Sequence, residues 1–350
     1  MQNILIIEPL FENDNADEKI EEITALCDSA EGKVVSVVTQ AIKVVTPSTF
    51  IGKGKAQTIK ETIELNSNVY TVDLCVFDGE LSPSQTLNLS DIIGVPVITR
   101  TNLILDIFAK RAKSSEGKIL VELAQLKYIY PRLKGKGDSM SRLGAGIGTR
   151  GPGETKLETD RRHIRARILS LENSLSKIRT RRNLEYLRRK KNRIKTVVLV
   201  GYTNVGKSTL LNLLCQSKDL EMDKLFATLD TSSKRAYING YDVVFIDTVG
   251  FIKELPDDLL EAFKSTLECV KEADLIINVA DATKNWRNQF TVTENLLKNL
   301  EHSAETVEVL NKCDNAPDEY VPEGVVKISA LKKQGVDELK NIVVQKLGLK

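Results

Sequence analysis

The sequence is poor in cysteine, histidine and aromatic residues, and it has no long apolar run. Its 350 residues include five cysteines, two histidines and 5% aromatic residues. The cysteines form no CxxC pair, which argues against a disulfide framework or a zinc site and favours a reducing, cytoplasmic environment. No apolar run approaches the roughly 20 residues that a membrane-spanning helix needs. The N-terminal residues lack the basic region and the small-residue cleavage site of a signal peptide, so we expect none.

Charge is abundant and unevenly distributed along the chain. Charged residues make up 28% of the sequence and hydrophobic residues 41%, as is typical of a globular, water-soluble protein. Residues 161–195 contain fourteen Lys/Arg against two acidic residues, a net charge of +12. Because the whole chain carries +2, the other 315 residues carry −10. Such a block is typical of a polyanion-binding surface, with nucleic acid favoured over a membrane; a solvated helix face is the alternative interpretation.

Strands and helices alternate in both terminal parts of the chain. We expect strands over 3–7, 34–38, 74–77 and 95–98, with helices over 16–29 and 56–65. A second series of strands and helices begins at Thr196. The predicted fold class is therefore α/β, with a small N-terminal α/β domain (1–117), a long antiparallel helical arm (118–195) and a C-terminal domain (196–350) that has a mainly parallel sheet.

The middle of the chain predicts two long helices joined by a polar loop. A helix over 103–133, broken near 114–117, is followed by the glycine-rich loop 135–153 and by a helix from Thr155 that pairs with it antiparallel. Apolar residues of the second helix recur at the spacing of a coiled-coil seam: Ile164, Ile168, Leu171, Leu175 and Ile178. Leu184 and Leu187 restart the pattern one place off, so we expect the helix to bend, end or change partner near them.

Residues 201–208 read GYTNVGKS and match the complete GxxxxGK[ST] phosphate-binding loop. The loop follows a β-rich run and precedes an apolar helix, which is the context that this motif requires. Backbone N–H groups and the helix N-terminus are expected to hold the phosphates. Lys207 would reach the β- and γ-phosphates, and the Ser208 hydroxyl would ligate Mg²⁺.

Three further segments indicate which nucleotide binds. DTVG, residues 247–250, follows an expected strand, so that Asp247 can hold Mg²⁺ through water and the Gly250 N–H can sense a γ-phosphate. NKCD, residues 311–314, has the NKxD pattern, in which Asp314 accepts hydrogen bonds from guanine and would be left unpaired by adenine. Ser329-Ala330-Leu331 follows another strand and can place a backbone N–H near guanine O6. Together these segments predict binding of GTP and GDP.

The segment between the phosphate loop and DTVG should hold a switch threonine. A threonine that ligates Mg²⁺ only with GTP bound is expected at Thr228, with Thr231 as the alternative. Phe251 follows DTVG, where many signalling GTPases have a glutamine that orients the attacking water. Because phenylalanine cannot orient water, the backbone, another side chain, a monovalent ion or a partner must do so. Asn204 is a candidate K⁺ ligand, and capping of the turn is its alternative role.

The candidate site residues follow from these motifs. The candidate catalytic residues are Lys207, Thr228 and Gly250, and the candidate metal ligands are Ser208, Thr228 and Asp247. The candidate nucleotide-binding residues are Gly201, Tyr202, Thr203, Asn204, Val205, Gly206, Lys207, Ser208, Thr209, Phe226, Ala227, Thr228, Leu229, Asp230, Asp247, Thr248, Val249, Gly250, Asn311, Lys312, Asp314, Ser329, Ala330 and Leu331.

The glycine-rich loop and several shorter segments carry a more specific signal. The loop leads into GTRGPGETKLETDRR, residues 148–162. Upstream lie FIGKGK (50–55), LSPSQ (81–85), ILDIFA (104–109) and ELAQL (122–126), and downstream lie GYTNVGKST, LFATLD and DTVGFI. These segments closely resemble the HflX family of ribosome-associated GTPases, and the resemblance covers essentially the whole chain. Lys156, where the family usually has glutamine, and Thr99, where aspartate is common, depart from it.

The resemblance implies a GTPase domain of the Obg-related type and a defined partner. The partner is the 50S ribosomal subunit, which would stimulate a low intrinsic rate of GTP hydrolysis while the protein splits or rescues stalled ribosomes. Basic side chains would then contact rRNA phosphates, the candidates being Arg150, Arg161, Arg162, Arg188, Arg189, Lys190 and Lys191. Because the expected last helix covers 335–347, we expect no further C-terminal domain of the kind that some members carry.

Two other functions are compatible with a GTP-binding domain. We expect the protein to be a monomer. A regulatory GTPase could act through a protein bound to its coiled-coil arm rather than through the ribosome. Co-sedimentation with 50S subunits separates these two functions. A tRNA-modifying GTPase would need a second catalytic chemistry, and the sequence offers no plausible Cys/His pair or cofactor loop for it.

Overall fold

A computed structural model describes residues 1–133, 152–216, 225–226, 232–252, 268–298, 300, 302–316 and 321–349, with only the backbone of 152–157. The chain divides into two compact units, each built around one β-sheet. The first unit contains residues 1–110 and 121–172, and the second contains residues 111–120 and 173–350. Within the described residues, no helix combines the length and the apolar character needed to cross a membrane.

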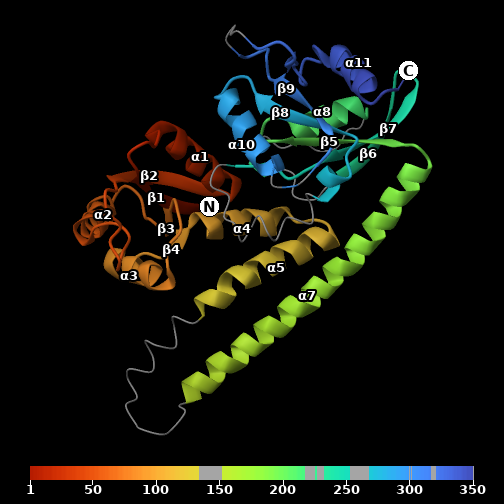
Figure 1. Cartoon of the computed structure of the whole chain (residues 1–350). Helices are drawn as coiled ribbons and strands as arrows, with labels where there is room; N and C mark the ends of the chain where they lie inside the picture. Colours follow the sequence, from red (N-terminus) through yellow and green to blue (C-terminus); the bar gives the residue numbers. More distant parts are fainter. Residues whose placement is uncertain are drawn as a thin grey trace. The chain divides into compact units, whose positions relative to one another are not determined.

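The first unit contains a four-stranded parallel sheet in the order β2-β1-β3-β4 (Figure 1). Its elements are β1 (Gln2–Leu10), α1 (Ala16–Ser29), β2 (Gly32–Ala41), α2 (Lys53–Leu65), β3 (Leu74–Phe77), α3 (Pro83–Ile93) and β4 (Val97–Thr99). Leu5 and Ile7 of β1 pack with residues of α2 and α3 on one face. Because side chains alternate along a strand, Ile4 and Ile6 point to the other face, where α1 lies. The predicted α/β character of this region is confirmed.

Two helices of the first unit begin at strong capping signals. The Asn15 side chain accepts a hydrogen bond from the Glu18 N–H and caps α1, whose first turn is acidic. Ser82 and Gln85 form a reciprocal capping box at the start of α3, with Pro83 in the first turn. The segment LSPSQ is therefore a helix start, and α3 ends at Gly94 in a left-handed conformation (φ 82°).

Three helices connect the two sheets in sequence: α4 (Arg100–Arg111), α5 (Ser115–Arg132) and α7 (Pro152–Lys191). The break between α4 and α5 lies where the sequence predicts it. In the first unit Lys127 pairs with Glu172, and in the second Glu116 pairs with Arg182. The later part of α5 thus meets the earlier part of α7, and the earlier part of α5 meets the later part of α7. This pairing is antiparallel, as predicted.

The contacts along the inner face of α7 change from apolar to charged toward the C-terminal end of the helix. Leu171 and Leu175 are buried, whereas Leu184 and Leu187 are 54% and 52% exposed. The helix continues to Lys191, and its ion-pair partner changes from Glu116 of α5 at Arg182 to Glu272 at Arg189, which agrees with the predicted change of partner. Positions 175, 182 and 189 are seven residues apart and share one face. At the last two positions Arg182 and Arg189 pair with Glu116 and Glu272, so ion pairs replace the apolar contacts.

The second unit contains a six-stranded sheet in the order β10-β9-β8-β5-β7-β6. Its strands are β5 (Lys195–Gly201), β6 (Ser232–Ile238), β7 (Tyr241–Asp247), β8 (Leu275–Asp281), β9 (Glu305–Asn311) and β10 (Val326–Lys327). All pairs are parallel except β6–β7, which confirms the predicted mainly parallel sheet. The antiparallel edge strand β6 did not follow from the expected series of strand–helix units.

Helices cover both faces of the second sheet. They are α8 (Lys207–Leu214), α10 (Trp286–Lys298) and α11 (Val336–Lys346). Val197 and Leu199 of β5 belong to a core with α8 and α11, whereas Val198 and Val200 belong to a core with the end of α10. This alternation shows that β5 is buried on both faces, as expected for a central parallel strand.

Candidate nucleotide-binding site

The candidate site lies at the carboxyl ends of neighbouring strands in the second sheet. The phosphate loop begins at the end of β5, DTVG begins at the end of β7, and NKCD begins at the end of β9. These strands are close neighbours in the order β9-β8-β5-β7. In open parallel sheets, ligands bind in the crevice outside the carboxyl ends of the strands. The topology therefore brings together the motifs that the sequence keeps far apart.

Two glycines allow the phosphate loop to pass close to its neighbours. Gly201 has a φ of 144°, and a Cβ there would lie 2.1 Å from the Val279 carbonyl oxygen. Gly206 has a φ of 92°, and a Cβ there would lie 2.3 Å from Asn311 Nδ2. Any other amino acid at these two positions would bring a Cβ into collision in a backbone conformation that favours glycine, so both motif glycines have a structural reason.

Lys207 is the first residue of α8 and is only 6% exposed. Its Nζ donates hydrogen bonds to the carbonyl oxygens of Gly201 at 2.9 Å and Tyr202 at 2.7 Å. Burial lowers the pKa of Lys207 to about 8, although the nearby Asp247 carboxylate opposes this shift. The loop thus holds its ammonium group at the place where the motif expects phosphates.

The two described candidate metal ligands lie side by side. Ser208 Oγ donates a hydrogen bond of 2.6 Å to Asp247 Oδ2, and Asp247 is 1% exposed. Next to them, Thr248 donates to the Leu199 carbonyl oxygen at 2.8 Å and attaches DTVG to β5. A hydroxyl beside a carboxylate is an oxygen donor set that suits a hard divalent cation. Thr228, together with Ala227, Leu229, Asp230 and Thr231, lies outside the described residues, whereas Phe226 is buried.

Asn311 connects the guanine motif to the phosphate loop. Its Nδ2 donates to the Val205 carbonyl oxygen at 2.8 Å, and its Oδ1 accepts from the Ala330 N–H at 2.9 Å. Lys312 donates to the Asn204 carbonyl oxygen at 2.9 Å and pairs with Asp281 at 2.7 Å. These contacts position the base-recognition segments relative to the phosphate segments. The sequence motifs did not predict the partner Asp281, although a carboxylate at the end of a buried strand is a usable signal.

Asp314 has the chemistry that guanine recognition requires. Its side chain is 5% exposed and lies 3.4 Å from Lys332 Nζ. Hydrogen bonding with Ser329, followed by the influence of Lys332, lowers the pKa of Asp314 below its ordinary value. The group is therefore an ionised acceptor at neutral pH, while the neighbouring Leu331 is 78% exposed.

Phe251 is directed into the core and not toward the phosphate loop. It is 2% exposed and packs in one cluster with Val198, Val200 and Val270. Its backbone pairs with the loop, because Phe251 O accepts from the Thr203 N–H at 2.7 Å and Phe251 N–H donates to Gly201 O at 3.1 Å. The residue after DTVG therefore contributes packing and supplies no side chain to the reacting phosphate.

The candidate rRNA-binding residues fall into different environments. Arg150 lies outside the described residues. Arg162, Arg188, Lys190 and Lys191 are exposed, while Arg161 lies over the ring of Tyr130 at 5.3 Å. Arg189 is different from its neighbours, because its guanidinium lies 4.0 Å from the Glu272 carboxylate and its side chain is 22% exposed.

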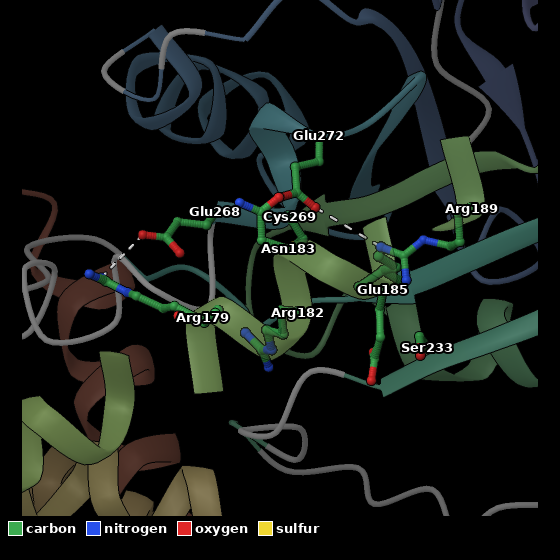
Figure 2. Close-up of a pocket in the computed structure, with 11 residues that line it drawn as sticks. Arg179, Arg182, Asn183, Glu185, Arg189, Ser233, Glu268, Cys269 and Glu272 are labelled. Atoms are coloured by element: carbon green, nitrogen blue, oxygen red, sulfur yellow. Dashed lines mark ion pairs between the residues drawn. The ribbon is translucent and has the colours of Figure 1, made fainter. Parts of the chain in front are cut away.

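A cavity of about 420 Å³ separates the end of α7 from the sheet of the second unit. Arg179 pairs with Glu268 at 3.1 Å on one side of it, and Arg189 pairs with Glu272 on the other, as Figure 2 shows. Ser233 also lines the cavity and pairs in the sheet with Ile246, next to Asp247. Two ion pairs thus connect the C-terminal part of α7 to residues 268–272.

Three family models match successive parts of the chain. A model described as "GTP-binding GTPase N-terminal" matches residues 17–109, and one described as "GTP-binding GTPase Middle Region" matches residues 111–189. A model described as "50S ribosome-binding GTPase" matches residues 196–312. The last match contains the phosphate loop and DTVG and ends within NKCD.

Curated relatives match over nearly the whole chain. GTPase HflX of Caldanaerobacter subterraneus subsp. tengcongensis is 47% identical over 349 residues, which cover 98% of this chain and 80% of that protein. GTPase HflX of Escherichia coli K12 is 39% identical over 320 residues, which cover 91% of this chain and 74% of that protein.

Solved structures share the fold over the same length. A GTP-binding protein from Sulfolobus solfataricus in complex with GDP covers 99% of both chains at 24% identity, with a TM-score of 0.51. A complex of the protein SsGBP with GDP also covers 99% of both chains, at 25% identity and a TM-score of 0.55. With the relatives above, these findings confirm the resemblance seen in the sequence: the chain belongs to the HflX family of GTPases, enzymes that hydrolyse GTP.

Proposed function

We propose that this GTPase binds the 50S ribosomal subunit through the basic part of α7 and uses GTP to split or rescue stalled ribosomes. The observation that carries the proposal is the basic last turn of α7, residues 188–191, directly before the domain that matches the 50S ribosome-binding model. Exposed arginine and lysine side chains on one helix provide the sequence-independent phosphate contacts that dominate binding to structured RNA.

The nucleotide site supports ordinary phosphoryl transfer with Mg²⁺. Ser208 and Asp247 are the described residues that would hold the ion, and Thr228 is the proposed third ligand. When bound, Mg²⁺ neutralises charge that develops on the phosphate oxygens. Lys207 would bind the β- and γ-phosphates, and the Gly250 N–H would donate to the γ-phosphate. Asp314 would accept from guanine and exclude adenine.

A low intrinsic rate with stimulation by the ribosome agrees with the position of Phe251. Its side chain is buried in the core, so the residue directly after DTVG places no side chain at the reacting phosphate. Measurement of GTP turnover in potassium buffer, with and without purified 50S subunits, tests this part of the proposal. Strong stimulation is the expected result. Unchanged turnover with intact GTP binding would mean that the activating partner is not the 50S subunit.

Asn204 is the proposed ligand for a stimulating K⁺ ion. The residue is exposed in the phosphate loop and has a left-handed backbone (φ 61°), with its carbonyl oxygen held by Lys312. Turnover in K⁺ should exceed turnover in Na⁺, and Asn204→Ala should remove the difference. If Asn204 only caps the turn, the variant will keep its preference for K⁺.

The ribosome contact is tested by removing charge without disturbing α7. Replacing Arg188, Lys190 and Lys191 together by alanine leaves the Arg189–Glu272 pair in place. We expect weaker co-sedimentation with 50S subunits and a smaller dependence of binding on salt. The log–log slope should fall by about one unit for each rRNA phosphate that the variant no longer neutralises. GTP affinity should not change.

A matched control removes three positive charges elsewhere in the second unit. Lys298, Lys340 and Lys346 lie on α10 and α11, away from α7 in the sequence. Their alanine variant should bind 50S subunits almost as the unchanged protein does. Equally weakened binding in both variants would show that only net charge matters. Undiminished binding by the α7 variant would refute the proposed contact and favour a protein partner on the arm.

A further inference from the structure

GTP hydrolysis needs a group that orients the attacking water, and the position after DTVG does not supply one. Phe251 lies in the core. Two nearby hydroxyls already make hydrogen bonds, because Thr248 donates to the Leu199 carbonyl oxygen and Ser208 donates to Asp247. A side chain beside Gly250, the proposed γ-phosphate sensor, is one of the groups able to orient this water.

Thr203 of the phosphate loop packs against Gly250 through its Cα and its methyl group. A Cβ placed on Gly250 would lie 2.8 Å from Thr203 Cα, 2.9 Å from Thr203 Cγ2 and 3.0 Å from Lys207 Nζ. The loop residue, the sensor glycine and the phosphate-binding lysine thus converge on one point. The backbone hydrogen bond from the Thr203 N–H to Phe251 O at 2.7 Å holds this arrangement.

The Thr203 hydroxyl has no hydrogen-bond partner among the described residues. The residue is 5% exposed, and its Oγ1 is fully buried. Buried hydroxyl groups are normally paired, so such a group calls for an explanation. Valine would fill the same space and would avoid the free-energy penalty of burying a hydroxyl that makes no hydrogen bond. A hydroxyl that gains its partner only when substrate and water are present accounts for its presence.

We propose that the Thr203 hydroxyl orients the water that attacks the γ-phosphate of GTP, in the role that glutamine has in many signalling GTPases. Thr203 Oγ1 accepts a hydrogen bond from the water and itself stays neutral. The water oxygen forms a bond to the γ-phosphorus, and the bond from that phosphorus to the β,γ-bridging oxygen breaks. GDP leaves with the electron pair, and both water protons remain on the phosphate as H₂PO₄⁻. The inference depends on GTP hydrolysis and not on the ribosome.

The test compares Thr203→Val, which keeps the shape, with Thr203→Ser, which keeps the hydroxyl. The measurements are the single-turnover rate of hydrolysis by the full chain in potassium buffer and the affinity for a non-hydrolysable GTP analogue. We expect Thr203→Val to lower the rate by about 10- to 100-fold while analogue affinity stays within about twofold. Thr203→Ser should recover most of the rate. Thr291→Val is the control, because Thr291 is exposed on α10 and its hydroxyl donates to the Arg287 carbonyl oxygen of the same helix.

A second readout does not depend on turnover. The complex of GDP with aluminium fluoride imitates the transition state, so Thr203→Val should weaken aluminium fluoride binding and leave GDP binding intact. An unchanged rate in Thr203→Val would overturn the proposal. A parallel fall of analogue affinity and rate in both Thr203 variants would also overturn it, because that pattern indicates a structural role in the loop. Should Thr203→Val fail to fold, Thr203→Ala against Thr203→Ser makes the same comparison.

Discussion

Charged side chains lie at the carboxyl ends of the parallel strands in both sheets. In the first unit they pair with one another, whereas in the second unit they surround the phosphate loop. In the first unit, Glu8 on β1 lies beside Asp78, which directly follows β3, and both are buried. Arg100 bonds Asp78 at 2.8 Å and also pairs with Glu22, while Lys19 lies 3.3 Å from Glu8. The charges of Arg100, Asp78 and Glu22 thus pair with one another inside the first unit.

In the second unit, charged groups surround the phosphate loop, whose backbone conformation depends on two glycines. Lys207 binds backbone carbonyl oxygens, and Asp314 is a nearly buried carboxylate that can accept from a base. Gly201 and Gly206 let the loop approach where any side chain would collide. The comparison teaches that a position at the carboxyl ends of a parallel sheet is not sufficient for a site. The glycine-dependent backbone and the supply of internal counter-charges decide between a ligand site and a structural salt bridge.

The largest effect should come from closing the glycine loop. Gly201→Ala would place a Cβ 2.1 Å from the Val279 carbonyl oxygen at a φ of 144°, so we expect nucleotide binding to be abolished. Gly94→Ala in the first unit is the counterpart, since its φ is 82° but nothing lies within 4 Å of the added atom. Gly94→Ala should lower the free energy of unfolding by only about 1 kcal/mol. Titration with fluorescent GDP and thermal unfolding measure both; wild-type affinity in Gly201→Ala would contradict this account.

The next largest effect should come from removing Arg100 from its buried ion pairs with Asp78 and Glu22. Arg100→Met leaves Asp78 and Glu22 without their shared partner, and breaking a buried pair from one side costs about 3–5 kcal/mol. The destabilisation should appear in hydrogen exchange of the β1 and β3 amides, while GDP affinity in the second unit should remain unchanged. Native protection of those amides in the variant would show that Arg100 does not hold the cluster.

A smaller effect should come from changing the base-reading group. Asp314→Asn replaces an acceptor by an amide, which removes a charge-assisted hydrogen bond to guanine worth about 3 kcal/mol, or roughly 100-fold in affinity. Because the amide can donate, binding of xanthine nucleotides should improve. Calorimetry with GDP and XDP measures both changes. Unaltered GDP affinity would show that Asp314 does not recognise the base.

The smallest effect concerns the pH dependence of the first unit. Burial, with the neighbouring Asp78, raises the pKa of Glu8 to about 9 from 4.5 and outweighs Lys19. Between these values the folded unit keeps a proton that the unfolded chain releases, so stability falls as pH rises, by about 1.4 kcal/mol per pH unit. Glu8→Gln should abolish this slope between pH 6 and pH 8 in hydrogen exchange of β1. An unchanged slope would show that Glu8 is ionised in the folded unit.

Much of the fold could be predicted from the sequence, and so could the motifs that meet at the carboxyl edge of the second sheet. The predicted bounds of α1 and β3 agree with the structure, because capping residues and short apolar runs act locally. The antiparallel strand β6 was missed, since nothing in its own residues states the direction of its neighbour. Leu184 and Leu187 restart the apolar pattern one place off, which predicted a bend, an end or a change of partner. Both are exposed, because the phase of α7 brings Arg182 and Arg189 to the face that pairs with Glu116 and Glu272.

Binding of GTP and the resemblance to the family follow from the residues alone, because each motif is contiguous and its glycine, lysine and aspartate chemistry works over a few residues. Which charged groups pair inside the protein, and which buried groups lack a partner among the described residues, depends on how the chain folds. Arg189 faces Glu272, Arg100 faces Asp78, and Thr203, whose hydroxyl is buried, packs against Gly250 through its Cα and its methyl group. These pairings depend on strand register, helix phase and burial, which arise only when segments distant in the sequence pack together.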